Sequence, residues 1–392
     1  MKKKTWIYAL TALMMSQGIS LLGSSIVSLA VKWYVTLETD SGGMVALVAV
    51  TTYLPQALVM LYGGVLADRH PPKRIIMLSD SAIALSTLIL SLMFFTGHGS
   101  IPWILVFNTL RSVGTGLQLP ATKSILPLIV PERELMRANG ISAGMWSLIM
   151  LVSPALGGLA LNYMPLQWVF LIDVFTAAVG VAILGAITVP KPERVEPPVS
   201  AQEGLASGLR YIAGSKTLKS CLILYAVFSF LVMPASELTP LLASRNVCDE
   251  VWVLSVVETA FSVGALTVSA YMGVRELRMS HFKLIGLSAA VFGATMILLL
   301  PARGIVPFAL LMLLMGVGSP LYYTPLITHI QENTDEAYMG RTFSYVDLLS
   351  SMASGLGMAL VGPLADLSIT LTFVVPGALL ILLGLYAGKR MG

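Results

Sequence analysis

The sequence predicts an all-α polytopic membrane protein whose twelve transmembrane helices form two pseudo-symmetric six-helix bundles. Of its 392 residues, 56% are hydrophobic and 11% are charged, and this charged share is less than half that of an average soluble domain. Apolar runs of about 18 residues or more, the length that crosses a bilayer, recur along the chain. One long polar segment near the middle separates them into two sets of six.

Each apolar run is expected to be helical, because only helices and closed barrels satisfy their backbone hydrogen bonds in lipid. The runs are too long for barrel strands, which need roughly 10 residues. The first run follows three lysines but is too long for the apolar region of a signal peptide, so we expect a retained helix. The predicted spans are residues 6–36, 44–67, 75–96, 102–125, 138–162, 166–189, 219–243, 251–273, 281–300, 304–328, 341–363 and 369–388.

The polar segment defines the domain organisation. We expect an N-terminal bundle over residues 1–189, a cytoplasmic linker over residues 190–218 and a C-terminal bundle over residues 219–392. The linker begins with several prolines and continues as a short amphipathic helix over residues 201–213, which is suited to lie at the membrane interface.

A weak internal echo supports a duplicated bundle. Gly114 and Gly116 in the fourth predicted span have counterparts in Gly316 and Gly318 of the tenth. Repeats of this kind are common in secondary transporters.

The distribution of Lys and Arg along the chain indicates which ends of the helices face the cytoplasm. With the N-terminus inside, 20 of the 24 Lys and Arg residues fall in cytoplasmic segments, and only Lys32, Arg111, Arg245 and Arg303 remain. Because cytoplasmic loops collect Lys and Arg, both termini are expected to be cytoplasmic.

A short cationic stretch, residues 64–74, connects the second and third spans. It resembles the signature loop of the major facilitator superfamily, G-x-L-A-D-R-x-G-R-[KR], through Gly64, Leu66, Ala67, Asp68, Arg69 and Lys73. Pro71 and Pro72 replace the usual Gly-Arg pair and should stiffen the loop. The resemblance implies a gating loop in which Asp68 caps or pairs at the cytoplasmic gate, with Arg69, Lys73 or Arg74 as partners. An ordinary positive-inside loop is the alternative.

The fifth span resembles the antiporter signature of drug-exporting facilitators, G-x8-G-x3-G-P-x2-G-G. The matching residues are Gly140, Pro154, Gly157 and Gly158, whereas Ile149 and Ser153 stand where glycines are expected. Small residues let two helices approach each other closely, and a proline bends the span. Generic small-residue packing is the alternative.

Candidate charge-coupling residues lie inside the spans. Arg111 resembles the arginine of a third family signature, R-x-x-G-x-G, and lies roughly 13 Å deep by helix rise, where a guanidinium needs a partner or water. Glu237 on the seventh span is the preferred proton carrier, with Glu258 and Asp173 as further candidates; Asp173 is more readily interpreted as structural. Asp80 is expected to hold loop arginines.

A substrate cavity is expected among the first, fourth, seventh and tenth spans, because methionine and aromatic side chains adapt to varied apolar ligands. Taken one at a time, each of these side chains is more typical of packed core than of a ligand contact. The candidate cavity residues are Gln17, Met14, Phe228, Met233, Tyr322 and Tyr323.

The whole pattern resembles the macrolide-efflux-like group of drug–proton antiporters, with local support in residues 110–114, 126–132, 172–174 and 339–344. The resemblance implies a monomeric exporter of amphipathic small molecules in the bacterial cytoplasmic (inner) membrane. It would exchange substrate for protons and would be surrounded by membrane lipids. No nucleic acid, cofactor or metal is expected. A siderophore or lysolipid transporter of the same fold remains open.

A membrane-embedded enzyme is the alternative from another functional class. No paired Asp-rich metal motif or nucleophile elbow appears in the sequence, and the four histidines, His70, His98, His281 and His329, are expected to be scattered at loops and helix ends. A nucleotide site is also unsupported, because the segment around Gly214 and Lys216 has the wrong glycine spacing for a phosphate-binding loop.

Overall fold

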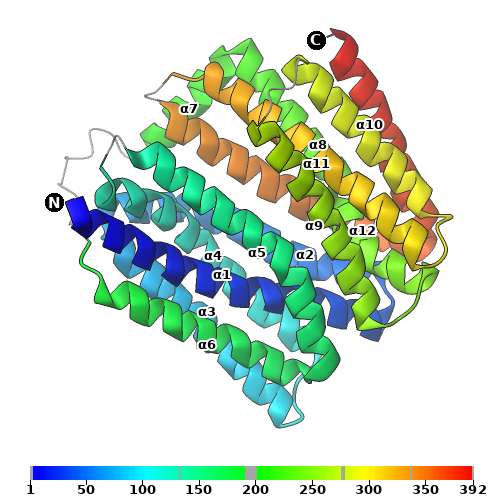
Figure 1. Ribbon diagram of the computed structural model, residues 1–392, viewed down its shortest axis with the longest axis horizontal. Helices are drawn as coiled ribbons and strands as arrows, with labels where there is room; N and C mark the ends of the chain where they lie inside the picture. The colour runs from blue at the N-terminus through cyan, green and yellow to red at the C-terminus, as the bar shows by residue number, and fades with distance from the viewer. Residues whose placement is uncertain (1–2, 132–133, 190–200, 275–278, 336–337, 391–392) are drawn as a thin grey trace. The chain divides into compact units, whose positions relative to one another are not determined.

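The computed structural model describes residues 3–131, 134–189, 201–274, 279–335 and 338–390, which form a succession of helices (Figure 1). The chain divides into two compact units. Unit 1 comprises Met1–Tyr34 with Thr51–Glu196, and unit 2 comprises Val35–Val50 with Pro197–Gly392. Residues 35–50 thus belong to unit 2, whereas the predicted N-terminal bundle runs without interruption from residue 1 to residue 189.

The helices follow the predicted spans closely. The first six are α1 (Lys3–Thr39), α2 (Gly42–Arg69), α3 (Pro72–Phe95), α4 (Ile101–Ile129), α5 (Leu135–Tyr163) and α6 (Leu166–Ala186). They are followed by α7 (Ala201–Gly214), α8 (Lys216–Asn246), α9 (Val251–Val274), α10 (His281–Leu299), α11 (Ile305–Glu332) and α12 (Met339–Arg390). Helix α7 is the short amphipathic helix predicted in the linker.

Ten of the described helices are long and apolar enough to cross a membrane. Helix α4 lies outside this group although it has 29 residues, because Asn108, Arg111 and Gln118 make it more polar. Helix α12 has 52 residues and is interrupted at Ser368, whose φ of −161° and ψ of 99° are not helical. With α4 included and α12 divided at Ser368, the described helices agree with the twelve predicted spans.

The connection between α2 and α3 is shorter than predicted. Helix α2 continues through Arg69, and the N–H of His70 donates to the carbonyl of Leu66 at 2.9 Å. Pro71 is the N-cap of α3 and Pro72 is its first residue, where a proline ring is compatible with helix geometry. Asp68 and Arg69 therefore belong to the last turn of a helix and not to a loop.

The packing of each unit is set by helix pairs that approach closely at glycines. In unit 1, α3 packs against α4 and α6; in unit 2, α10 packs against α11 and α12, α11 against α9, and α12 against α8. At Gly116 the backbone of α4 meets Gln56 of α2, and at Gly316 the backbone of α11 meets Phe261 of α9. A larger residue at either position would force the two backbones apart.

Residues 35–50 join unit 2 through polar contacts with α12. Asp366 on α12 accepts hydrogen bonds from the N–H of Gly42 at 2.6 Å and of Gly43 at 2.9 Å, and from Ser41 Oγ at 3.0 Å. Gly42 is the first residue of α2, so the carboxylate lies at a helix N-terminus, where the unpaired N–H groups and the helix dipole favour a negative charge.

A second polar contact involves α8 of the same unit. Arg245, in the last turn of α8, donates to the Asp40 carboxylate at 2.8 Å and to the Asp40 carbonyl at 2.6 Å. Both side chains are exposed enough for solvent to screen the pair, so we expect it to contribute little by itself.

We expect Asp366→Ala to lower the free energy of unfolding by about 1–2 kcal/mol, because it removes the acceptor that caps α2. The free energy of unfolding of Asp366→Asn should lie between those of Asp366→Ala and the wild type, since an amide oxygen still accepts hydrogen bonds. Glu38→Ala is the control, because Glu38 is an exposed acid in the same segment. The measurement is the midpoint of thermal unfolding in detergent; equal midpoints for the two alanine variants would contradict the capping role.

Candidate functional site

A buried ion pair lies in the interior of unit 1. Arg111 on α4 is paired with the Asp173 carboxylate on α6, and it also contacts Thr87 on α3. The Arg111 side chain is 10% exposed and the Asp173 side chain is fully buried. The same carboxylate accepts from Ser24 Oγ at 2.8 Å and from Thr87 Oγ1 at 3.1 Å. Asp173 thus binds α1, α3 and α4 to α6.

This arrangement accounts for the arginine in the apolar interior of α4. A buried guanidinium is expensive unless a counter-ion and further hydrogen bonds compensate its lost hydration, and Asp173 supplies the counter-ion. The sequence predicted that Arg111 needs a partner and separately favoured a structural role for Asp173. It did not predict that the two residues form one pair.

The expectation that Asp80 holds loop arginines is not supported by its contacts. Asp80 on α3 is 2% exposed. It accepts from Ser20 Oγ at 3.0 Å and from the Gln118 side-chain amide at 2.8 Å. Gln118 and Thr122 on α4 also lie at 3.4 and 3.3 Å from the side-chain oxygen of Gln17. Asp80 therefore belongs to a second buried polar network that links α1, α3 and α4.

The predicted gating stretch is only partly visible in its side chains. Gly64 lies in α2 with Asp68 and Arg69, but the side chains of Asp68 and Arg69 lie outside the described part of the structure. Arg74 is exposed. Lys73 donates to the carbonyls of Gly185 at 2.9 Å and Ile187 at 2.6 Å, at the C-terminal end of α6. An ammonium group at this position satisfies carbonyls that the helix leaves unpaired.

The antiporter-like residues have different surroundings along α5. Pro154, Gly157 and Gly158 are buried, and a Cβ added at Gly157 would lie at ordinary contact distance from Leu29 of α1. A Cβ added at Gly140 would meet no described atom within 4 Å. In this structure, close helix approach thus does not explain the glycine at position 140.

Unit 2 contains a cavity of about 240 Å³. Most of its wall is apolar, with aromatic and methionine side chains, and hydroxyl groups and one carboxylate supply its polar atoms. It is lined by Tyr225, Phe228, Ser229, Val232, Met233, Ala235 and Ser236 of α8, Glu258 and Phe261 of α9, Phe292 of α10, Met312, Met315, Ser319, Tyr322 and Tyr323 of α11, and Ser350 and Ser354 of α12.

Stacked rings form one side of this cavity. The rings of Phe228 and Tyr322 are stacked with centroids 3.5 Å apart, and Phe292 meets Phe228 edge-on at 5.5 Å. The Tyr322 hydroxyl donates to the carbonyl of Leu224 at 3.1 Å, which satisfies the phenol in an apolar setting. The ring positions are therefore fixed by packing before a ligand arrives.

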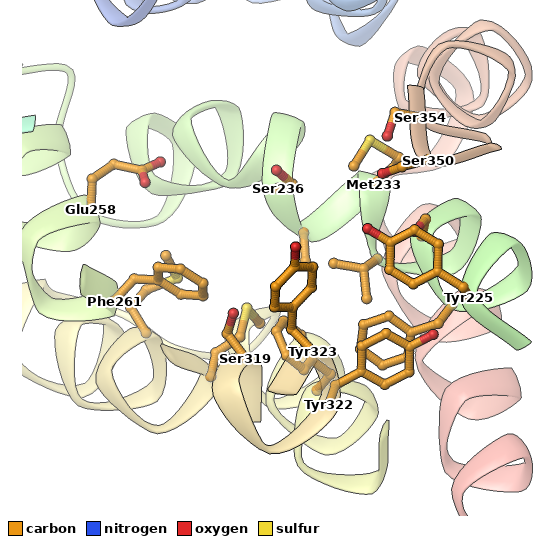
Figure 2. Close-up of a pocket in the computed structure, with 17 residues that line it drawn as sticks. Tyr225, Met233, Ser236, Glu258, Phe261, Ser319, Tyr322, Tyr323, Ser350 and Ser354 are labelled. Carbon is orange, nitrogen blue, oxygen red and sulfur yellow. The ribbon is translucent and has the colours of Figure 1, made fainter. Parts of the chain in front are cut away.

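Glu258 is the acid among the described residues that line the cavity. It lies at one end of the labelled group, and Tyr225 and Tyr322 lie at the other (Figure 2). Glu237, the preferred proton carrier in the sequence analysis, is instead 4% exposed within α8. Its carboxylate lies 3.4 Å from the hydroxyl of the adjacent Ser236. The geometry therefore favours Glu258 over Glu237 for contact with a ligand.

Four of the six predicted cavity residues, Phe228, Met233, Tyr322 and Tyr323, line this cavity. The other two belong to unit 1. Gln17 is buried in the polar network around Asp80, and Met14 packs on an apolar core to which all six helices α1 to α6 contribute.

Several lining residues were not predicted, although their spacing carries a signal. On α11, Met312, Met315, Ser319 and Tyr322 recur at three- and four-residue intervals, and on α12 Ser350 and Ser354 lie four apart. Such intervals place side chains on one helix face. The pattern marks the face but does not tell whether it borders a cavity or packed core.

The comparisons with known proteins give one consistent family. Residues 13–357 match the sequence profile described as Major Facilitator Superfamily. Macrolide efflux protein A of Streptococcus pyogenes is 27% identical over 386 residues, which cover 97% of this chain and 95% of that protein. Enterobactin exporter EntS of Escherichia coli O1:K1 / APEC is 24% identical over 383 residues, which cover 93% and 89% of the two chains.

The fold is similar to that of solved transporters. A crystal structure of a POT family transporter in complex with 5-aminolevulinic acid superposes with a TM-score of 0.78 at 14% identity, covering 96% of this chain and 94% of that one. Together with the helices described above, the match over residues 13–357 shows that the chain belongs to the Major Facilitator Superfamily and is a multi-pass membrane transporter rather than an enzyme.

Proposed function

We propose that the protein exports cationic amphipathic small molecules by alternating access, in exchange for protons. The observation that carries this proposal is the cavity of unit 2, in which aromatic and methionine side chains surround a space with one carboxylate. Aromatic rings attract cations through their electron-rich faces, and methionine adapts to ligands of varied shape. An acid in this setting favours a basic ligand.

The size of the cavity limits what it holds. Its volume of about 240 Å³ is smaller than the roughly 300–1,000 Å³ of sites for drug-sized ligands. We therefore propose that it receives the basic part of a larger substrate. Macrolides that carry a protonatable amine belong to this chemical class, and macrolide efflux protein A of Streptococcus pyogenes is similar to this chain over almost its whole length.

Coupling to protons follows from competition at Glu258. A bound cation and a proton each neutralise the carboxylate, and the group cannot hold both at once. Substrate and proton then bind alternately to one group. Exchange of one proton for one singly charged cation moves no net charge, so the pH gradient drives uphill export, at about 1.4 kcal/mol per pH unit.

The proposed setting is the bacterial inner membrane, with both termini cytoplasmic and the monomer as the working unit. The distribution of Lys and Arg supports this orientation. The named relatives are bacterial proteins.

Export of an anionic siderophore is the second candidate, because the enterobactin exporter EntS is also similar to this chain. The described lining of the cavity includes Glu258 and contains no lysine, arginine or histidine. A carboxylate without a basic neighbour would repel an anionic ligand, so we favour the cationic class.

Tyr323 offers a direct test of the binding site, because it lines the cavity and its side chain is half exposed. Tyr323→Ala should weaken binding of a basic macrolide about 5- to 30-fold, equivalent to about 1–2 kcal/mol of lost ring contact, whereas Tyr323→Phe should bind nearly as the wild type does. Tyr271→Ala is the control, since Tyr271 is equally exposed on α9. Equilibrium binding to purified protein is the measurement, and equal affinities for the two alanine variants would refute the site.

A further inference from the structure

The structure brings two of the four histidines together, although they are far apart in the sequence. His281 is the first residue of α10, and His329 lies in the last turn of α11. Their ring centroids are 5.7 Å apart. The expectation that the histidines are scattered is therefore wrong for this pair.

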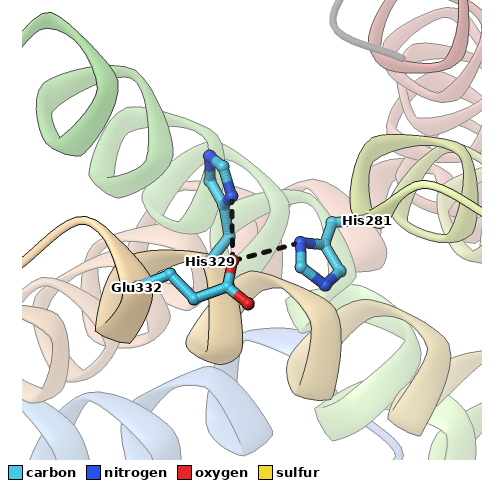
Figure 3. A group of neighbouring side chains, drawn as sticks. All are labelled: His281, His329 and Glu332. Carbon is cyan, nitrogen blue, oxygen red and sulfur yellow. Dashed lines mark ion pairs between the residues drawn. The ribbon is translucent and has the colours of Figure 1, made fainter.

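Glu332 completes a group of three donors at this end of unit 2. Its Oε2 lies 3.8 Å from Nδ1 of His281 and 3.9 Å from Nδ1 of His329 (Figure 3). One ligand atom from each of the three side chains lies within 4.8 Å of the others. His329 and Glu332 are three residues apart on one helix and thus share a face.

We propose that His281, His329 and Glu332 form a binding site for a divalent transition metal of the zinc class. Two imidazoles and a carboxylate are a donor set that Zn²⁺ accepts, usually with a water in the fourth position. Nitrogen donors select against Mg²⁺ and Ca²⁺, which prefer oxygen. The site shares no residue with the described lining of the cavity that we assign to substrate, and it does not depend on the proposed transport function.

The geometry requires a contraction of the group. Ligand atoms bound to zinc at about 2.1 Å in a tetrahedral arrangement lie about 3.4 Å apart, whereas Glu332 Oε2 lies 3.8 and 3.9 Å from the two imidazole nitrogens and the three ligand atoms lie within 4.8 Å of one another. The Glu332 side chain is 55% exposed and that of His281 is 34% exposed. Both can turn toward an ion, and the exposure leaves room for a bound water.

Neighbouring residues hold His329 in place. The Phe282 ring meets the His329 imidazole edge-on with centroids 5.0 Å apart, and the Asn333 side-chain amide donates to the His329 carbonyl at 2.9 Å. An ion at this position would tie the start of α10 to the end of α11, the helix that carries Met312, Ser319 and Tyr322 of the cavity. Metal binding should therefore stabilise unit 2.

The test is Zn²⁺ binding to the full chain, purified without a histidine tag and stripped with a chelator. We expect one Zn²⁺ per chain by isothermal titration and a rise in the thermal unfolding midpoint. Either His281→Ala or His329→Ala should weaken binding about 10-fold or more, since even changes beyond the direct ligands have effects of that size. Glu332→Gln should also weaken Zn²⁺ binding. Because this change is conservative and its side chain is exposed, the variant should fold even if a histidine variant does not.

Two controls make the outcome decisive. His98→Ala removes an exposed histidine of unit 1, and Cys248→Ser removes an exposed thiol outside the cluster; both should leave binding unchanged. The proposal is overturned if the stripped protein binds no Zn²⁺, or if the three cluster variants bind it as tightly as the controls do.

Discussion

Asp173→Asn is expected to lower the free energy of unfolding by about 3–5 kcal/mol, because it leaves the Arg111 guanidinium buried without a counter-ion. Arg111→Gln should cost a similar amount by leaving the Asp173 carboxylate, which is fully buried, unpaired. Arg111→Lys keeps the charge but loses the planar guanidinium, so it should be intermediate. The thermal unfolding midpoint in detergent, measured for each variant, checks the order.

The double variant Arg111→Met/Asp173→Leu provides the control. Replacing a buried ion pair by apolar side chains of similar size is often neutral or stabilising, so the double variant should be more stable than Asp173→Asn or Arg111→Gln. If Asp173→Asn unfolds at the wild-type temperature, the pair is not a structural element of unit 1. A double variant that folds well but does not transport would assign the pair a role in coupling.

Glu258→Gln is expected to weaken binding of a cationic substrate about 10- to 100-fold, since a hydrogen bond to a charged group contributes about 1.5–3 kcal/mol. Binding of a neutral amphipathic compound should change little. The variant should also lose proton-driven uphill export while downhill substrate exchange remains measurable, because the glutamine cannot alternate between proton and cation. Binding assays with charged and neutral substrates, and transport with and without a pH gradient, separate these effects.

Glu237→Gln is the matched control on the neighbouring helix. Glu237 is 4% exposed, and its carboxylate lies close to Ser236, so a neutral isostere should leave uphill export intact. If Glu237→Gln abolishes export and Glu258→Gln does not, the coupling acid is Glu237, the residue preferred in the sequence analysis.

The helices could be predicted from the sequence because a bilayer requires long apolar runs and internal backbone hydrogen bonds. The errors lie at the ends, where helix signals are weak. Helix α2 continues through Arg69 because the prolines that break it come after His70. The two spans of α12 were predicted separately, and the break between them is at Ser368.

Contacts between helices could not be predicted in the same way. Arg111 and Asp173 were each identified as unusual, but their pairing depends on how α4 and α6 pack. The glycine echo shows the same limit. Gly116 on α4 and Gly316 on α11 face the equivalent helices α2 and α9, although the sequence aligned Gly116 with Gly318. The two halves therefore repeat the same helix contacts, but the glycine that makes each contact lies at a different position of the aligned segments.

The candidate site was partly predicted because methionine and aromatic residues stand out in a transporter sequence. Phe228, Met233, Tyr322 and Tyr323 share a cavity, and Glu258 was among the candidate acids. Periodicity gives the face of a helix but not its neighbours, and the preference for Glu237 rested on the expectation that the seventh span lines the cavity. His281 and His329 were missed for the same reason, since only the packing of α10 against α11 brings them together.

The central claim is that a cationic amphipathic substrate and a proton exchange across the membrane through this protein. The most direct measurement is proton flux in proteoliposomes of the wild-type protein, recorded with a pH-sensitive dye when a basic macrolide is added. We expect substrate to release protons from preloaded vesicles, and an imposed pH gradient to drive accumulation of substrate against its concentration. Substrate movement without proton movement, or no response to any basic amphipathic compound while an anionic siderophore is transported, would contradict this account.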